Sequence, residues 1–240
     1  MSTAAQEFVS EQLQLNKRRQ KLHPILRRIV PFFAKLEVYG LERMPASGAT
    51  LMIGNHISLI DPILLTSAVE NRYVISMAKA ETLEHPIERL GLEIWGNFVI
   101  NRGEVDRKAL NNTIELLKNE QLVWIAPEGT RNPGGMQEAK SGVSYIAHKA
   151  NAIIVPSAIC GSKFWTQRLK SFRRVEANIY FGKPFRFRVP EGERLSREVR
   201  EQMITEAMYQ VAITIPEEYA EQRGVYSDID NATTKYLEFV

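Results

Sequence analysis

Between Leu36 and Ala158, short apolar segments alternate with stretches of helical periodicity, and this alternation constrains the fold more than any other feature. The segments expected to form strands are residues 36–39, 50–54, 73–77, 98–100, 122–126 and 153–158. The stretches expected to form helices between them are residues 62–69, 106–118 and 140–149. Strands that alternate with helices are typical of α/β domains. We therefore expect a single α/β domain with a largely parallel mixed sheet flanked by helices.

The rest of the chain extends this domain at both ends. Residues 174–181 alternate as a half-buried strand and residues 196–215 have one apolar helical stripe, so we assign residues 36–215 to the α/β domain. Residues 1–35 are expected to form an amphipathic helical segment, with Pro24 in a first turn and Pro31 kinking or dividing it. Residues 216–240 are polar, and we expect a loosely structured tail.

Basic residues gather in two zones of an otherwise acidic chain. Between Glu11 and Glu37 there is no acidic residue, and the basic ones are Lys17, Arg18, Arg19, Lys21, Arg27, Arg28 and Lys35. The second zone has the single acidic residue Glu176 among Lys163, Arg168, Lys170, Arg173, Arg174, Lys183, Arg186 and Arg188. Basic amphipathic helices bind in the headgroup plane of anionic membranes. These zones predict polyanionic partners, and we interpret residues 1–35 as a membrane-contact segment.

The sequence also indicates a compartment. The longest apolar run, residues 29–34, is far shorter than the roughly 20 residues that a spanning helix needs. The N-terminus has no secretory signal pattern, and the single Cys160 excludes an internal disulfide. We expect a cytoplasmic protein that binds peripherally to the cytoplasmic face of a membrane.

A histidine and an aspartate follow the second expected strand, in the stretch Asn55-His56-Ile57-Ser58-Leu59-Ile60-Asp61-Pro62. Ligands of α/β sheets bind at the carboxyl ends of strands, where His56 would lie. Asp61 before Pro62 has the form of a helix N-cap. An imidazole that is bonded to a carboxylate can take a proton from an alcohol. His56 and Asp61 are therefore candidate catalytic residues, the alternative being a loop histidine beside a cap.

Two further blocks follow other strands. Pro127-Glu128-Gly129-Thr130-Arg131 combines a glycine for close backbone approach, a hydroxyl and a guanidinium suited to phosphate. Phe98-Val99-Ile100-Asn101-Arg102-Gly103 places a second arginine after a strand. Because parallel strands share one carboxyl edge, we expect His56, Arg102 and Arg131 to converge on one polar site.

Taken together, these blocks carry a family resemblance. Asn55-His56 with Asp61, residues 98–103, Glu128-Gly129-Thr130-Arg131 and Val155-Pro156, in this order, resemble the four blocks of the glycerolipid acyltransferases, the 1-acylglycerol-3-phosphate acyltransferase family. Lys140 with Gly142 resembles a supporting block. The resemblance covers about residues 36–188.

The resemblance implies roles for individual residues. His56 is similar to the catalytic base of the family and Asp61 to the group that orients it. Arg102 and Arg131 resemble ligands of the acceptor's phosphate. The remaining substrate-binding candidates of the acceptor site are Glu128, Gly129, Thr130 and Lys140. Ala126 and Asn101 depart from residues common in the family, which puts the details of the acceptor pocket in doubt.

The resemblance also implies the reaction and the partners. A fatty acyl group would move from acyl-coenzyme A or acyl carrier protein to 1-acylglycerol-3-phosphate, forming phosphatidate, with no cofactor and no metal. Another lysolipid acceptor is an alternative. A metalloenzyme using His56, Asp61 and Glu128 as ligands, and a non-catalytic module that binds anionic lipid or nucleic acid, are further alternatives; we expect no nucleic-acid partner.

Overall fold

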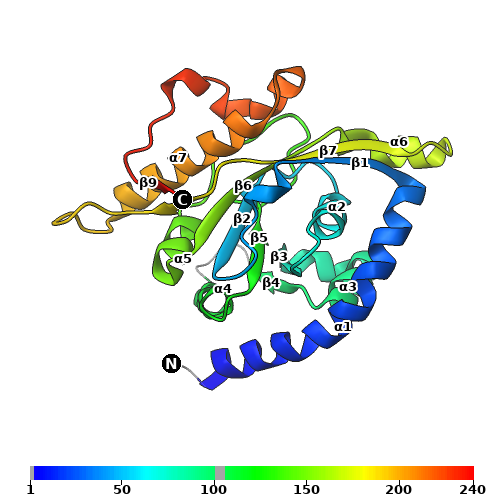
Figure 1. Cartoon of the computed structure of the whole chain (residues 1–240), viewed down its shortest axis with the longest axis horizontal. Coiled ribbons are helices and arrows are strands. Elements are labelled where there is room, and N and C mark those ends of the chain that lie inside the picture. Colours follow the sequence, from blue (N-terminus) through cyan, green and yellow to red (C-terminus); the bar gives the residue numbers. More distant parts are fainter. Residues whose placement is uncertain (1–2, 101–105) are drawn as a thin grey trace.

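The computed structural model describes residues 3–100 and 106–240, and its strands form one mixed sheet (Figure 1). The order across the sheet is β1-β7-β6-β2-β5-β3-β4, with β8 paired to β6 and β9 paired to β8. The strands are β1 (Ala34–Tyr39), β2 (Thr50–Gly54), β3 (Val74–Lys79), β4 (Phe98–Ile100), β5 (Leu122–Ile125), β6 (Ile153–Cys160), β7 (Val175–Phe181), β8 (Phe185–Phe187) and β9 (Leu237–Phe239).

Most neighbouring strands are parallel, as the alternation of strands and helices predicts. β6, β2, β5, β3 and β4 run in one direction, and the register places Ile53 of β2 between Ile125 of β5 and Pro156 of β6. β7 runs antiparallel to β6 and carries β1 parallel to itself. The carboxyl ends of β2 and β5 therefore meet at one edge, which is where the candidate blocks begin.

Helices cover both faces of the sheet (Figure 1). The α-helices are α1 (Thr3–Phe33), α2 (Asp61–Ala68), α3 (Pro86–Trp95), α4 (Arg107–Lys118), α5 (Gly142–Ala150), α6 (Trp165–Lys170) and α7 (Arg197–Thr214). The 3-10 helices are η1 (Leu41–Arg43), η2 (Ala80–Glu84), η3 (Ser162–Phe164), η4 (Glu217–Tyr226) and η5 (Ile229–Asn231). Side chains alternate along β2, so that Leu51 and Ile53 pack with α4, α5 and α7, whereas Met52 packs with α2 and the end of α1.

The N-terminal helix α1 fills almost the whole segment, residues 1–35, that the sequence predicts to be helical. It begins at Thr3, so Pro24 lies in its interior and the expected place of Pro24 in a first turn is wrong; Pro31 also lies inside the helix. Figure 1 shows α1 changing direction as it passes around the sheet, and a proline inside a helix removes one backbone hydrogen bond and bends it.

A buried arginine attaches α1 to α3. Arg19 Nε donates to the carbonyl of Trp95 at 2.9 Å, and its Nη2 donates to the carbonyl of Gly96 at 3.0 Å. Burial, followed by the neighbouring charge of Arg18, lowers the pKa of Arg19 to about 10, so the guanidinium stays charged at neutral pH. A cation at the last carbonyls of a helix is favourable. Arg19 therefore holds α1 at the carboxyl end of α3.

The C-terminal residues are packed, which corrects the expectation of a loosely structured tail. Tyr226 and Tyr236 are buried in the same core as α7, and β9 pairs with β8. The buried carboxylate of Glu206 accepts hydrogen bonds from the backbone N–H groups of Lys235 and Tyr236. The polar composition is misleading because a few aromatic residues and one buried acid are enough to fix this segment.

Within residues 3–100 and 106–240, no helix has the length and apolar character needed to span a membrane.

Candidate active site

The chain leaves the sheet abruptly after β2, and this places His56 at its edge. A Cβ atom at Gly54 would lie 2.5 Å from the carbonyl oxygen of Ser157, so only glycine fits between β2 and β6 here. The next residue, Asn55, uses its side chain in place of backbone pairing: its amide donates to the carbonyl of Ile159 at 2.9 Å, and it accepts from the Ile159 N–H at 2.8 Å. Backbone pairing ends there, and the chain turns with His56 on the outside.

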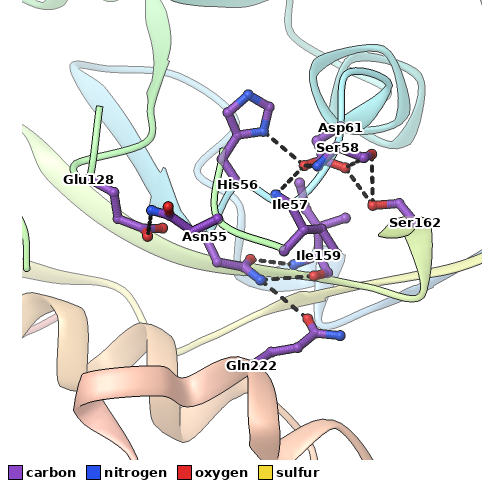
Figure 2. Close-up of polar contacts among 10 residues, drawn as sticks. Asn55, His56, Ile57, Ser58, Asp61, Glu128, Ile159, Ser162 and Gln222 are labelled. Atoms are coloured by element: carbon purple, nitrogen blue, oxygen red, sulfur yellow. Dashed lines mark hydrogen bonds and ion pairs between the residues drawn. The ribbon is translucent and has the colours of Figure 1, made fainter. Parts of the chain in front are cut away.

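Asp61 organises the loop that carries His56 (Figure 2). Its Oδ2 accepts from His56 Nδ1 and from the backbone N–H groups of Ile57 and Ser58, all at 2.8 Å. Its Oδ1 accepts from the hydroxyls of Ser58 at 2.7 Å and Ser162 at 2.6 Å. The expected contact between His56 and Asp61 is confirmed. The expected N-cap is wrong: the cap position of α2 is Ile60, and Asp61 bonds back to the loop instead of to its own helix.

These contacts keep Asp61 ionised despite complete burial. Burial alone raises the pKa of Asp61, but the hydrogen bond and charge of His56, with the hydrogen bonds of Ser162 and Ser58, hold it below its ordinary value. An ionised carboxylate can only accept hydrogen bonds, so His56 Nδ1 carries the hydrogen of their bond. The other ring nitrogen, Nε2, is thereby left with a free lone pair, and Figure 2 shows it on the side of the ring away from Asp61. His56 can act as a base toward whatever lies in front of it.

Ser162 is a site residue that the sequence analysis missed. It follows β6, far from His56 in the sequence, and its buried hydroxyl lies 2.9 Å from that of Ser58. A serine after a strand is too common to be singled out. The parallel pairing of β6 with β2 is what places Ser162 beside Asp61.

The block after β5 forms a tight turn that faces the same space. The N–H of Gly129 donates to the carbonyl of Ala126 at 2.9 Å, and Gly129 has a φ of +73° that favours glycine. The N–H of Lys140 donates to the carbonyl of Pro127 at 3.0 Å. The Lys140 side chain lies beside Gly129, where a Cβ would be in ordinary van der Waals contact, 3.4 Å from Nζ. The turn thus holds Lys140 next to Gly129, and the positive φ is what favours glycine there.

Glu128 lies behind this turn. Its carboxylate accepts from the side-chain amide of Asn132 and from the backbone N–H of Gln137 at 2.8 Å. The N–H of Asn132 in turn donates to the carbonyl of His56 at 2.7 Å. Burial, only partly offset by these hydrogen bonds, raises the pKa of Glu128. The structure thus gives Glu128 contacts that fix the position of the turn relative to His56.

His56 and the turn share a cavity of about 700 Å³. Its polar lining includes His56, Thr130, the cationic Lys79, Arg131 and Lys140, and the acidic Glu88 and Asp106. Its apolar lining includes Leu22, Ile25, Leu26 and Ile29 of α1, Ile63 of α2, and Leu92, Ile94 and Trp95 of α3. A cavity of this size that combines charged and apolar lining suits an amphiphile. Of the expected site residues, His56, Gly129, Thr130, Arg131 and Lys140 line the cavity, Asp61 and Glu128 hold the loop and the turn that carry them, and Arg102 lies outside the described residues.

Most of the chain that builds this site matches a known protein family. A family model described as Acyltransferase matches residues 35–160, which is more than half of the 240 residues. The chain belongs to the acyltransferase family. His56, Asp61, the 127–131 turn and Lys140 all lie within the matched residues, whereas α1 and the C-terminal segment lie outside them.

Individual acyltransferases are similar over different lengths. A 1-acyl-sn-glycerol-3-phosphate acyltransferase of Borreliella burgdorferi is 30% identical over 125 residues, covering 51% of this chain and 50% of that protein. A Bacillus subtilis protein of the same name is 25% identical over 175 residues, covering 71% of this chain and 86% of that protein. The chain spans about half the length of several curated relatives that it matches.

A solved structure shares the fold of this chain. The crystal structure of the 1-acyl-sn-glycerophosphate (LPA) acyltransferase PlsC from Thermotoga maritima matches with a TM-score of 0.57 and 23% identity, covering 80% of this chain and 78% of that chain. The expected α/β architecture is thereby confirmed by comparison as well as by the strand order.

Among the residues that the structure describes, no group of three or more His, Cys, Asp or Glu side chains is placed to hold a metal ion.

The C-terminal segment supports the loop between Arg131 and Lys140. The N–H of Met136 donates to the carbonyl of Gln222 and the N–H of Val225 donates to the carbonyl of Met136, both at 3.0 Å. The Gln222 side chain also reaches the amide of Asn55 at 3.4 Å. Residues outside the part matched by the family model thus hold the loop that connects Arg131 and Lys140.

Substituting Gly224 with alanine tests this support. A Cβ at Gly224 would lie 2.1 Å from the carbonyl oxygen of Met136, so the loop must shift. Because displacements of about 1 Å at a positioning residue can cost about 10²-fold in rate, we expect kcat/KM for acyl transfer to fall by about 10- to 100-fold. Gly192→Ala is the matched control, since Gly192 also has a positive φ but no atom within 4 Å of its Cβ position. Equal activity of the two variants would contradict the supporting role.

Proposed function

We propose that the protein transfers a fatty acyl group from a thioester, acyl-coenzyme A or acyl carrier protein, to the free hydroxyl of 1-acylglycerol-3-phosphate, forming phosphatidate. The observation that supports this most strongly is the shared cavity. A histidine whose neutral form has a free Nε2 lone pair, the cationic side chains of Lys79, Arg131 and Lys140, and a long apolar wall line the same space. These are the groups that a phosphate-bearing lipid alcohol needs for binding and deprotonation.

In the proposed reaction, His56 acts as general base. Its Nε2 takes the proton of the acceptor hydroxyl as the oxygen attacks the thioester carbonyl. The resulting imidazolium is stabilised by the ionised Asp61, to which Nδ1–H donates at 2.8 Å. The carbon–sulfur bond breaks, the acyl group is left as an ester, and the thiolate can recover the proton from His56. No covalent acyl-enzyme is needed because a thioester is already activated.

Arg131 and Lys140 are proposed to bind the acceptor's phosphate. Both line the cavity near His56, and Lys140 is fixed by its backbone bond to Pro127. Guanidinium groups bind phosphate oxygens through charge-assisted hydrogen bonds. Gly129 and Thr130 shape this end of the cavity, Glu128 holds the turn in place, and Arg102 is proposed as a second arginine for the same phosphate.

The reaction is proposed to occur at the cytoplasmic face of a membrane, to which the protein binds peripherally. Ile25 and Ile29 of α1 line the cavity and are also about half exposed. An apolar helix face of this kind, with Arg27 and Arg28 beside it, suits the interface of an anionic bilayer. A lipid acceptor would then enter the cavity from the bilayer along α1.

The proposed activity is tested by release of free thiol. Acyl-coenzyme A and acyl carrier protein are offered as donors, with 1-acylglycerol-3-phosphate in vesicles as acceptor and lysophosphatidylcholine in parallel vesicles. We expect thiol release that depends on the phosphate-bearing acceptor, and lipid chromatography should show phosphatidate. If thiol were released only with lysophosphatidylcholine, that lipid would be the acceptor instead of 1-acylglycerol-3-phosphate. No release with either acceptor and either donor would refute the proposal.

Replacing Arg131 by alanine tests the phosphate assignment. Since a hydrogen bond to a charged group contributes about 1.5–3 kcal/mol, we expect KM for 1-acylglycerol-3-phosphate to rise by about 10- to 100-fold. The acceptor KM is measured in the thiol assay at saturating donor. Arg194→Ala, which removes an exposed arginine before α7, is the control and should leave KM unchanged. An unchanged KM in Arg131→Ala would assign phosphate binding to other residues.

A further inference from the structure

One part of each basic zone lies at the same end of the fold, where β1 pairs with β7. β1, which follows α1, pairs in parallel with β7, and the register places Ala34 opposite Val175. The residues before Ala34 belong to the first basic zone, and the residues before Val175 belong to the second. Arg174 donates to the carbonyl of Pro31 at 3.4 Å, which joins the end of α1 to the segment that connects β6 and β7. The end of α1 and the basic segment before β7, far apart in the sequence, therefore lie side by side.

The segment between β6 and β7, residues 162–174, projects from the body of the protein. Figure 1 shows α6 at an extremity of the molecule, beyond the end of α1. Trp165 and Leu169 of α6 pack against the core that contains α2. Phe164 is left 56% exposed and Phe172 is completely exposed. The projection is thus anchored on one side and presents aromatic rings on the other.

Phe172 is in an unfavourable conformation for a side chain of its kind. Its φ is +53°, in the left-handed region that bulky residues rarely adopt. Its backbone N–H donates to the carbonyl of Leu169 at 3.0 Å, which ends α6 with this residue on the outside. Glycine would fit this backbone conformation better, and the Phe172 ring is left in solvent instead of being buried in the core.

The basic side chains around these rings indicate which kind of partner the rings contact. Lys163, Lys170 and Arg173 are exposed beside them, and Lys163 Nζ lies 5.6 Å from the centre of the Phe164 ring. Phe32, 82% exposed, ends the stripe of α1 that begins with Ile25 and Ile29 at the cavity. Aromatic rings flanked by Lys and Arg are suited to a bilayer interface with anionic headgroups. The stripe connects this surface to the cavity.

We propose that Phe32, Phe164 and Phe172, with Lys163, Lys170 and Arg173, form a docking surface for an anionic lipid bilayer. The rings enter the interface while the cationic groups contact lipid headgroups. The proposal rests on the proposed acyl transfer at a membrane and adds a second contact region to α1. It orients the protein so that the apolar stripe of α1 lies along the bilayer and the cavity opens to it.

Vesicle co-sedimentation of the full chain tests the docking surface. The probes are vesicles of phosphatidylcholine with phosphatidylglycerol, and vesicles of phosphatidylcholine alone. Phe172→Gly removes the ring and relieves the positive φ, so its loss of binding cannot come from a damaged fold; we expect about tenfold weaker partitioning. Arg173→Ala should weaken binding about fivefold on anionic vesicles only. Ile213→Ala, an exposed apolar residue of α7, is the matched control and should bind like the wild type.

Activity measurements separate this proposal from the proposed function. With short-chain acceptor and donor below their aggregation concentrations, Phe172→Gly should turn over like the wild type, while with vesicles it should be slower. Unchanged vesicle binding in both Phe172→Gly and Arg173→Ala would overturn the docking surface. If these variants bound vesicles like the wild type but had a raised KM for acyl carrier protein, the surface would bind that acidic protein instead, and the bilayer-docking proposal would be overturned. Reduced vesicle binding in a protein that transfers no acyl group would support the surface and refute the proposed function.

Discussion

Substituting His56 with alanine is expected to lower kcat for acyl transfer by about 10²- to 10⁴-fold, the range contributed by a general base. The acceptor hydroxyl is a poor nucleophile while it keeps its proton, and His56 Nε2 is proposed to take that proton inside the cavity. KM for the acceptor should change little, since the cationic residues that bind phosphate remain. The measurement is thiol release at saturating donor and acceptor.

The control for this variant is His85→Ala, which removes an exposed histidine at the start of α3. It should retain full activity. Thermal unfolding should show that His56→Ala keeps its fold, because the imidazole is only partly buried. If His56→Ala turned over at the rate of the wild type, the assignment of the base would be wrong, and the family relationship would have to be reconciled with another proton acceptor.

Asp61→Asn is expected to have a comparable effect on kcat, on the order of 10²- to 10⁴-fold. An amide that replaces an orienting carboxylate leaves an imidazole in the wrong tautomer and without a compensating charge, as in serine proteases that carry the same substitution. Here the same atoms also hold the loop, because Asp61 accepts hydrogen bonds from Ile57, Ser58 and Ser162. We therefore expect a loss of stability as well, of about 3 kcal/mol in the free energy of unfolding.

The stability effect has a defined pH dependence. Folding lowers the pKa of Asp61, so the stabilisation from its carboxylate is complete above the ordinary carboxyl pKa and is lost as pH falls through the folded value. The difference between wild type and Asp61→Asn in urea unfolding should thus be constant near neutral pH and shrink in acid. Ser162→Ala, which keeps the carboxylate and removes one donor, should show a smaller loss of activity. A pH-independent difference would mean that Asp61 is not ionised in the folded protein.

The local parts of the fold and site follow from the sequence because they depend on neighbouring residues. β2 and β5 are apolar runs that end at Gly54 and before Pro127, and their parallel pairing was expected from the alternation of strands and helices. The contact of His56 with Asp61 spans five positions and needs only one turn of the chain. For such features, apolar periodicity and the chemistry of adjacent side chains are sufficient information.

Other parts depend on partners that are distant in the sequence. Arg19 reads as one of several solvated charges in a basic segment, yet it is buried because the end of α3 supplies carbonyl acceptors. Ser162 has no distinguishing pattern until β6 lies beside β2. The C-terminal segment has few apolar residues, which is why the sequence predicts a loose tail. The backbone hydrogen bonds between Val225 and Met136 depend on a distant loop, and the composition of the segment itself does not indicate them.

The pairing of β1 with β7 has a consequence for how the protein is made. α1 and β1 leave the ribosome before the other strands, but the strand to which β1 binds, β7, is synthesised after nearly all of the strands that form the rest of the sheet. Until then, the core that buries Val30 of α1 is incomplete, because it includes Val175, Ala177 and Ile179 of β7. Non-local pairing of this kind slows folding and exposes apolar surface meanwhile. A nascent chain whose first helix binds to bilayers would be protected by reaching the membrane before its sheet is complete, so the timing of synthesis and of membrane arrival would be coupled.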